Sequence, residues 1–169
     1  MTPTVDTILS DVLDREGWPQ YTEHPHDKGG PTKGGITLRT LESWRHRRLP
    51  RQDLARLKRE EALQILQRLY IDANGIFRLI GSPLLAQVVD SAVLSGPSLA
   101  MKEVQRLVDV SDDGICGPIT MAAIDAVDVE ELGRRLAVAR ALRLARFAVK
   151  HENQTTFLVG WLTRALSFV

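Results

Sequence analysis

The chain has 169 residues, of which 44% are hydrophobic and 25% charged, ordinary values for a globular protein with one hydrophobic core. Its 22 basic and 21 acidic residues leave a formal net charge of +1, so the charge balance argues against nucleic acid as a partner. Cys116 is the only cysteine, which excludes an internal disulfide.

The N-terminal segment MTPTVDTILSDVLDREG carries acidic residues where a secretory signal needs basic ones, and its apolar residues are spaced rather than continuous. No apolar run reaches the length that crosses a bilayer, because Thr163 and Arg164 interrupt the C-terminal FLVGWLTRALSFV. We therefore expect a chain that is made in the cytoplasm without a signal peptide and that does not insert stably into a membrane.

The first predicted element is an amphipathic helix, which Gly17 is expected to end. Its apolar stripe consists of Val5, Ile8, Leu9, Val12 and Leu13. The segment after Gly17 is rich in glycine and proline, which predicts a loop with a short β-hairpin. Thr37 has the position of an N-cap for a short helix that runs through Trp44.

The rest of the chain predicts helices joined by turns. Helical spacing indicates one or two helices over residues 53–71, and SDDGICGP is expected to form a turn. The other predicted helices begin at Ser82-Pro83, span 98–109, run from Pro118 to about residue 126, and cover 130–150 and 155–168. We predict a mainly α fold of the α+β class, in a single domain over 1–169.

Glu16 stands at the end of the first predicted helix. It lies eleven positions after Val5, so an ideal helix places it about 20° from Val5, near the centre of the apolar stripe. Apolar surroundings disfavour the charged form of a carboxyl group, which then keeps its proton near neutral pH and acts as a general acid. The alternative is that the helix frays before Glu16, whose side chain then meets water or pairs with an arginine.

The segment that follows Glu16 offers further site residues. Five of the twelve glycines lie between Arg15 and Thr37, and glycine lets the backbone approach a ligand closely. Three small polar residues of the segment, Asp27, Thr32 and Thr37, are candidates to fold over Glu16. Trp18 and Tyr21 provide flat apolar faces of the kind on which sugar rings stack, although simple packing would also explain them.

A metal site is the competing explanation for part of this segment. His24 and His26 directly precede Asp27, and imidazole and carboxylate groups are common metal ligands. In one turn-rich loop, however, such groups are more often ordinary surface residues. We predict that the protein uses no metal and no other cofactor.

The ordered motifs resemble those of glycoside hydrolase family 108. Glu16-Gly17 and the run DKGGPTKGGIT, from Asp27 to Thr37, resemble the opening of that family, and Trp18 stands where the family usually has a second glycine. The stretch LLAQVVDSAVLSGPSLAMKEVQRLVDVSDDGICGPITMAAI resembles its predicted peptidoglycan region, and FLVGWLTR resembles its closing segment. The resemblance covers nearly the whole chain, with the catalytic motif region at about 1–80 and the peptidoglycan region at about 81–169.

The resemblance implies a lysozyme-like helical domain with a short N-terminal β-hairpin. It implies an N-acetylmuramidase that hydrolyses the β-1,4 bond of bacterial peptidoglycan, of the bacteriophage endolysin type, acting on the cell wall after another factor releases it from the host cytoplasm. The family's catalytic glutamate falls on Glu16. The Asp and Thr that accompany the catalytic Glu in the related bacteriophage lysozymes point to Asp27 and Thr32, with Glu23 as the reserve carboxylate.

Additional residues are candidates to line a sugar groove. Tyr70 is expected at the end of a central helix, and Gln87 and Asp90 lie about one turn apart on the next helix. Core packing, helix capping or surface charge would account for them equally well. We expect a monomer whose partner is peptidoglycan, and we expect no nucleic acid partner.

Two other functions fit the same sequence. A lytic transglycosylase needs one acid and no water, whereas Asp27 and Thr32 favour hydrolysis. A peptidoglycan-binding protein without catalysis would account for DDGICGPITMAAI, but it would not need Glu16 on an apolar face.

Overall fold

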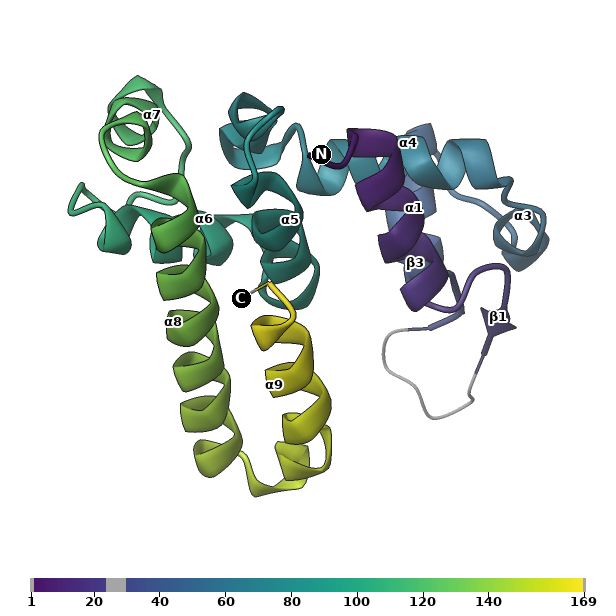
Figure 1. Ribbon diagram of the computed structural model, residues 1–169. Coiled ribbons are helices and arrows are strands. Elements are labelled where there is room, and N and C mark those ends of the chain that lie inside the picture. Colours follow the sequence, from purple (N-terminus) through teal and green to yellow (C-terminus); the bar gives the residue numbers. More distant parts are fainter. Residues whose placement is uncertain (1, 24–29, 169) are drawn as a thin grey trace. The chain divides into compact units, whose positions relative to one another are not determined.

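The computed structural model describes residues 2–23 and 30–168, and the chain divides into two compact units (Figure 1). The N-terminal unit comprises Thr4–Leu69, and the C-terminal unit begins at Tyr70. No helix among the described residues is both long and apolar enough to span a bilayer.

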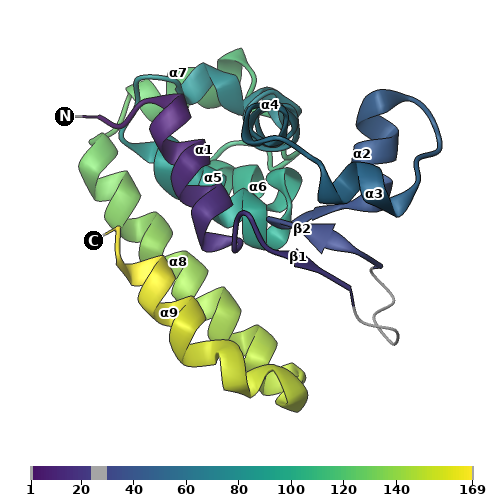
Figure 2. The same cartoon turned by 90° about the vertical axis from the view of Figure 1, so that its right-hand side faces the viewer.

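The N-terminal unit combines helices with a small sheet. Figure 2 looks along the axis of α4, with α1 on one side of it and α2 and α3 on the other. The elements are α1 (Val5–Arg15), β1 (Tyr21–Thr22), β2 (Thr32–Lys33), β3 (Ile36–Thr37), α2 (Leu38–Arg45), α3 (Arg51–Ala55) and α4 (Arg59–Tyr70). The predicted helical region 53–71 is thus a pair of helices.

Helix α1 forms as its pattern predicts. The Thr4 hydroxyl caps its start by accepting a hydrogen bond from the backbone N–H of Thr7 at 3.2 Å. Its expected apolar stripe is buried at Ile8, Leu9, Val12 and Leu13. Gly17 follows the helix with a φ of 84°, a conformation that glycine adopts without steric cost, so the expected stop is confirmed.

The three strands form an antiparallel sheet in the order β1-β2-β3. Tyr21 pairs with Lys33, and Lys33 pairs in turn with Ile36. The two residues between β2 and β3, Gly34 and Gly35, have φ values of 54° and 75°. Two positive φ angles in a two-residue loop are the requirement of a type I′ hairpin turn, which matches the right-handed twist of strands. The predicted hairpin is confirmed, with a third strand added.

Thr37 ends β3 and caps α2, as the sequence predicts. Its hydroxyl accepts a hydrogen bond from the backbone N–H of Thr40 at 3.1 Å. The same residue therefore closes the sheet and starts the helix.

The C-terminal unit is helical. Its elements are η1 (Ala73–Leu79), α5 (Leu84–Ser95), α6 (Pro97–Leu107), α7 (Pro118–Asp125), α8 (Val129–Lys150), η2 (Glu152–Phe157) and α9 (Leu158–Leu166). Helices α8 and α9 run side by side in both views (Figures 1 and 2). The 3₁₀ segments η1 and η2 were not predicted. In η1, Asn74 and Gly75 take positive φ angles and break the helical period.

The turn SDDGICGP is organised by one buried glutamine. Gln105 donates from Nε2 to the Asp113 carboxylate at 2.8 Å and the Ile115 carbonyl at 3.0 Å, and its Oε1 accepts from the Gly114 N–H at 2.8 Å. Cys116, within this turn, is buried and donates its backbone N–H to the Asn74 carbonyl at 2.7 Å. Burial raises the pKa of the Cys116 thiol.

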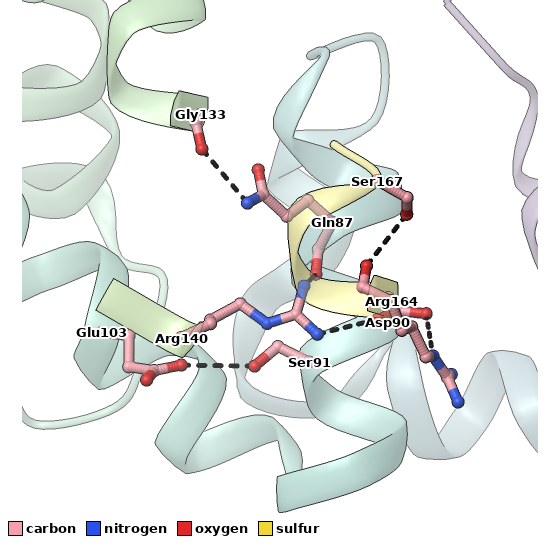
Figure 3. Close-up of polar contacts among 8 residues, drawn as sticks. All are labelled: Gln87, Asp90, Ser91, Glu103, Gly133, Arg140, Arg164 and Ser167. Carbon is pink, nitrogen blue, oxygen red and sulfur yellow. Dashed lines mark hydrogen bonds and ion pairs between the residues drawn. The ribbon is translucent and has the colours of Figure 1, made fainter. Parts of the chain in front are cut away.

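A buried cluster of charges joins the helices of this unit (Figure 3). Asp90 on α5 is 1% exposed and accepts from Nη2 of Arg140 on α8 at 2.7 Å and from Nε of Arg164 on α9 at 2.6 Å. Glu103 on α6 accepts from the Ser91 hydroxyl at 3.3 Å and from Nε of Arg143 at 2.6 Å. The cluster ties four helices together through side chains rather than through apolar packing alone.

We predict that Asp90→Asn lowers the free energy of unfolding by about 3–5 kcal/mol, because it leaves the buried Arg140 guanidinium without its counter-charge. Arg164→Met removes a partly exposed partner and leaves the Asp90–Arg140 pair intact, so about 1.5–3 kcal/mol is expected. Urea denaturation followed by circular dichroism measures both. A smaller loss for Asp90→Asn than for Arg164→Met would contradict this account.

Candidate functional site

Glu16 lies directly after α1, at its C-cap position, with φ −77° and ψ 9°. Its side chain is exposed, which corrects the expected position on the apolar side and agrees with the alternative in which the helix ends before Glu16 and its side chain meets water. The reason is local: the apolar stripe is complete at Leu13, and the chain leaves helical geometry at Glu16 before the next turn forms. Among the described residues, no hydrogen bond or ion pair engages the Glu16 carboxylate.

The glycine turn of the sheet lies against Glu16. A Cβ added at Gly35 would be 3.1 Å from Cβ and Oε2 of Glu16 and 3.2 Å from its Cγ. These distances are tighter than ordinary van der Waals contact, so the backbone of the turn touches the glutamate along its length. The hairpin therefore fixes one side of the Glu16 side chain and leaves another side open to solvent.

The neighbouring glycine, Gly34, packs closely against two other side chains. A Cβ at Gly34 would be 2.8 Å from Cε3 of Trp18 and 3.0 Å from Cδ1 of Leu13. Lys33 lies with its Nζ 5.0 Å from the centre of the Trp18 ring, and the same ammonium donates to the carbonyls of Ala55 and Leu57. The sequence predicts that these glycines approach a ligand, whereas the structure shows that they approach the protein's own side chains.

A row of threonines crosses one face of the sheet. Thr22 pairs with Thr32, and Thr32 pairs with Thr37. Residues directly opposite each other in a sheet project from the same face. The hydroxyls of Thr22 and Thr32 are hydrogen-bonded at 2.8 Å, and the opposite face carries the buried Ile36. The sheet thus presents Thr32 and Thr37 on one face, and its turn contacts Glu16.

The second carboxylate of the predicted site lies outside the described residues. Asp27 falls in residues 24–29, as do His24 and His26. The reserve, Glu23, accepts a hydrogen bond from the Tyr21 hydroxyl at 2.8 Å and forms an ion pair with Arg51. The hydrogen bond to Glu23 raises the pKa of Tyr21. Within the described ranges, no group of three or more metal-binding side chains comes together.

The three other predicted sugar-binding residues belong to the C-terminal unit, where two of them are buried. Gln87 is 2% exposed and donates from Nε2 to the Gly133 carbonyl at 3.1 Å, while Asp90 belongs to the charged cluster of Figure 3. Their burial gives them a structural role, which corrects the expectation that they line a sugar groove. Tyr70, the last residue of α4, is half-buried.

Sequence reasoning missed the contact between Gly35 and Glu16. The turn itself can be predicted from the sequence, because a Gly-Gly pair between two short segments of strand-like pattern is typical of a tight hairpin turn. What the sequence did not contain was the side chain on which that turn packs, since this depends on how the sheet folds back onto α1.

The fold is mainly α and lysozyme-like, and it holds the exposed Glu16 carboxyl group at the end of α1 against the glycine turn of the hairpin, an arrangement compatible with a glycoside hydrolase. The model of the family described as glycosyl hydrolase 108 matches residues 9–96, more than half of the chain, and that of a predicted peptidoglycan domain matches residues 61–166. The chain belongs to the glycosyl hydrolase 108 family.

A solved structure supports the same assignment. SagA of Brucella abortus is 29% identical to the chain, and the match covers 97% of this chain and 94% of that one with a TM-score of 0.73. No curated protein sequence matches. The family and the predicted peptidoglycan domain together identify a glycosidase that degrades peptidoglycan.

We predict that Gly35→Ala impairs cleavage of peptidoglycan more than it impairs folding, because the added methyl group displaces Glu16. Gly81→Ala is the matched control: Gly81 also has a positive φ, 90°, but its Cβ would meet nothing within 4 Å. Backbone strain of about 1 kcal/mol is common to both variants. Equal cleavage rates for the two variants would show that the contact with Glu16 has no role in activity.

Proposed function

We propose that the protein is an N-acetylmuramidase that hydrolyses the β-1,4 bond between N-acetylmuramic acid and N-acetylglucosamine, with Glu16 as the general acid. The observation that carries the proposal is the position of Glu16: its carboxyl group is exposed, held against Gly35, and bonded to no other described side chain. The contact with the Gly35 turn distinguishes Glu16 from other exposed carboxylates of the unit, such as Glu60.

The proposed reaction begins with proton transfer. The Glu16 carboxyl group donates its proton to the glycosidic oxygen, the bond from the muramic acid C1 to that oxygen breaks, and N-acetylglucosamine leaves with a free 4-hydroxyl group. A sugar bound over Glu16 would exclude water from the carboxyl group, and loss of water favours the neutral, proton-donating form. An exposed carboxyl group in the free protein is compatible with this role.

The second half of the reaction needs a group on the other side of the sugar. We assign Thr32 to orient the attacking water and Asp27 to stabilise the oxocarbenium-like sugar or to activate that water. Thr32 is suited to this because it shares a face of the sheet with Thr37, and the turn between them contacts Glu16. Glycosidases whose two catalytic carboxyl groups lie about 5–5.5 Å apart retain the configuration of the sugar at the cleaved bond. A separation of about 6.5–9.5 Å leaves room for a water molecule between them, and such enzymes invert that configuration.

The partly exposed aromatic residues Trp18 and Tyr21 would bind sugar rings on the N-terminal unit, with Thr37 as a further contact. In the cell, we propose, the protein is a bacteriolytic endolysin that reaches the wall from the cytoplasm after another factor releases it. The predicted peptidoglycan domain supports the wall as its site of action.

Glu16→Gln is expected to reduce cleavage of purified peptidoglycan by about 10²–10⁴-fold while the protein stays folded, because the amide keeps the volume but has no acidic proton. Glu60→Gln, an exposed glutamate of the same unit, is the matched control and should cleave at the unchanged rate. Release of soluble sugar from the wall measures the rate. Undiminished cleavage by folded Glu16→Gln would remove Glu16 from the mechanism.

Mass analysis of the released fragments distinguishes the reaction type. Hydrolysis adds one water and leaves a reducing muramic acid, whereas a lytic transglycosylase leaves an anhydro sugar that is lighter by that water. We expect reducing ends, and we expect Asp27→Asn and Thr32→Ala to slow their formation. If both variants cleave at the normal rate, the water must be activated by another group. A protein that binds the wall but releases nothing would be a non-catalytic binding protein.

A further inference from the structure

The N-terminal unit contains a concave surface between α2 and α4. It encloses about 630 Å³, within the usual range for ligand pockets. Helix α2, which forms one wall, lies on the other side of α4 from α1, the helix that ends at Glu16 (Figure 2). We call it the α2–α4 pocket, and its lining residues are Arg39, Thr40, Ser43, Trp44, His46, Ile65, Arg68 and Leu69.

The α2–α4 pocket is positively charged. Its lining includes two arginines and a histidine, and none of its lining residues is acidic. Arg39 and Arg68 are exposed, and no other described residue forms a hydrogen bond or ion pair with either side chain. By contrast, four other arginines of the unit pair with carboxylates: Arg45 with Glu61, Arg48 with Glu42, Arg51 with Glu23 and Arg59 with Asp14. The pocket therefore offers two guanidinium groups that are available to an anion.

The apolar wall of the α2–α4 pocket is fixed in orientation. Trp44 lies beside the Glu61 carboxylate, with which it interacts. Glu61 forms a bidentate ion pair with Arg45, whose Nε and Nη2 donate hydrogen bonds to its two carboxylate oxygens at 2.8 Å and 2.7 Å. These bonds from Arg45 hold the pKa of Glu61 below its usual range, so the ion pair persists at neutral pH. The indole ring is thus set in place beside Ile65 and Leu69.

We propose that the α2–α4 pocket binds a stem peptide of peptidoglycan through its free carboxylates. The wall polymer joins sugar strands to short peptides, and in the intact polymer the negative charges lie mainly on those peptides. Guanidinium groups match carboxylates in a two-point geometry, and the Trp44 wall suits the methyl and methylene groups of the same peptide. This inference rests on peptidoglycan as the substrate and adds a second point of attachment to it.

Such a pocket would hold the polymer while Glu16 acts elsewhere on the unit. A second contact with the same polymer raises the effective concentration of sugar strands at the site without changing the chemistry there. The contribution of the α2–α4 pocket to wall binding should therefore depend on whether the wall still carries its peptides.

The test compares binding to intact wall and to wall from which an amidase has removed the peptides. The full-length chain carries Glu16→Gln so that the polymer is not consumed, and co-sedimentation measures binding. Arg39→Ala with Arg68→Ala should weaken binding to intact wall by roughly three- to tenfold, the range for two partly solvated ion pairs. Binding to the peptide-free strands should not change.

Arg47→Ala with Arg56→Ala is the matched control, because it removes the same charge from two exposed arginines of the unit that lie outside the pocket and, among the described residues, have no carboxylate partner. It should bind both polymers as the parent chain does. Equal weakening on intact and peptide-free wall, or normal binding of the pocket variant to intact wall, would overturn the proposal. Circular dichroism confirms that both double variants are folded.

A soluble probe separates this inference from the proposed function. Titration of the chain with a free stem tripeptide of alanine, glutamate and a diamino acid should change the fluorescence of Trp44, and Trp44→Phe should abolish that change. Because the titration involves no cleavage, it succeeds or fails whatever reaction Glu16 performs. The proposal would also be overturned if the free tripeptide caused no fluorescence change at a peptide concentration equal to the one at which intact wall saturates the chain.

Discussion

The contact between the Gly34–Gly35 turn and the end of α1 is the constraint on which the N-terminal unit depends. A type I′ turn needs two positive φ angles, and the approach to Trp18 and Glu16 leaves no room for a Cβ atom without displacement. Because both requirements fall on the same two residues, the hairpin can be closed and packed onto the helix only by glycines. The carboxyl group, the aromatic ring and the threonine row take their positions from that one turn.

The sequence predicted what depends on local patterns. The stripe of α1, the stop at Gly17, the cap at Thr37 and the helix starts at Pro83 and Pro118 are set by neighbours within a few residues, and the structure confirms them. The exposed environment of Glu16 corresponds to the alternative in which the helix ends before it, and the apolar position was wrong because an ideal helix was extended one residue past the point where α1 ends. Asp90 was assigned to the substrate because its partners, Arg140 and Arg164, lie 50 and 74 positions away.

The two units differ in how they use charge. In the C-terminal unit, the cluster around Asp90 and Glu103 is buried and paired, an arrangement that adds little net stability over apolar packing but penalises helices that meet in another register. In the N-terminal unit, several charged groups remain exposed and without a described partner, among them Glu16, Arg39 and Arg68. The exposed groups of the N-terminal unit are those on which the two proposals rest, whereas the buried cluster joins helices of the C-terminal unit.

Cys116 has a consequence for the surroundings in which the protein can work. Its thiol is enclosed in the C-terminal unit, and burial favours the neutral form over the thiolate, the form that attacks disulfides and oxidants. It is also the only cysteine of the chain. The folded protein therefore has no sulfur–sulfur bond to lose in a reducing environment and no accessible thiol with which to form one in an oxidising environment, so its covalent structure is indifferent to the redox state on either side of a membrane.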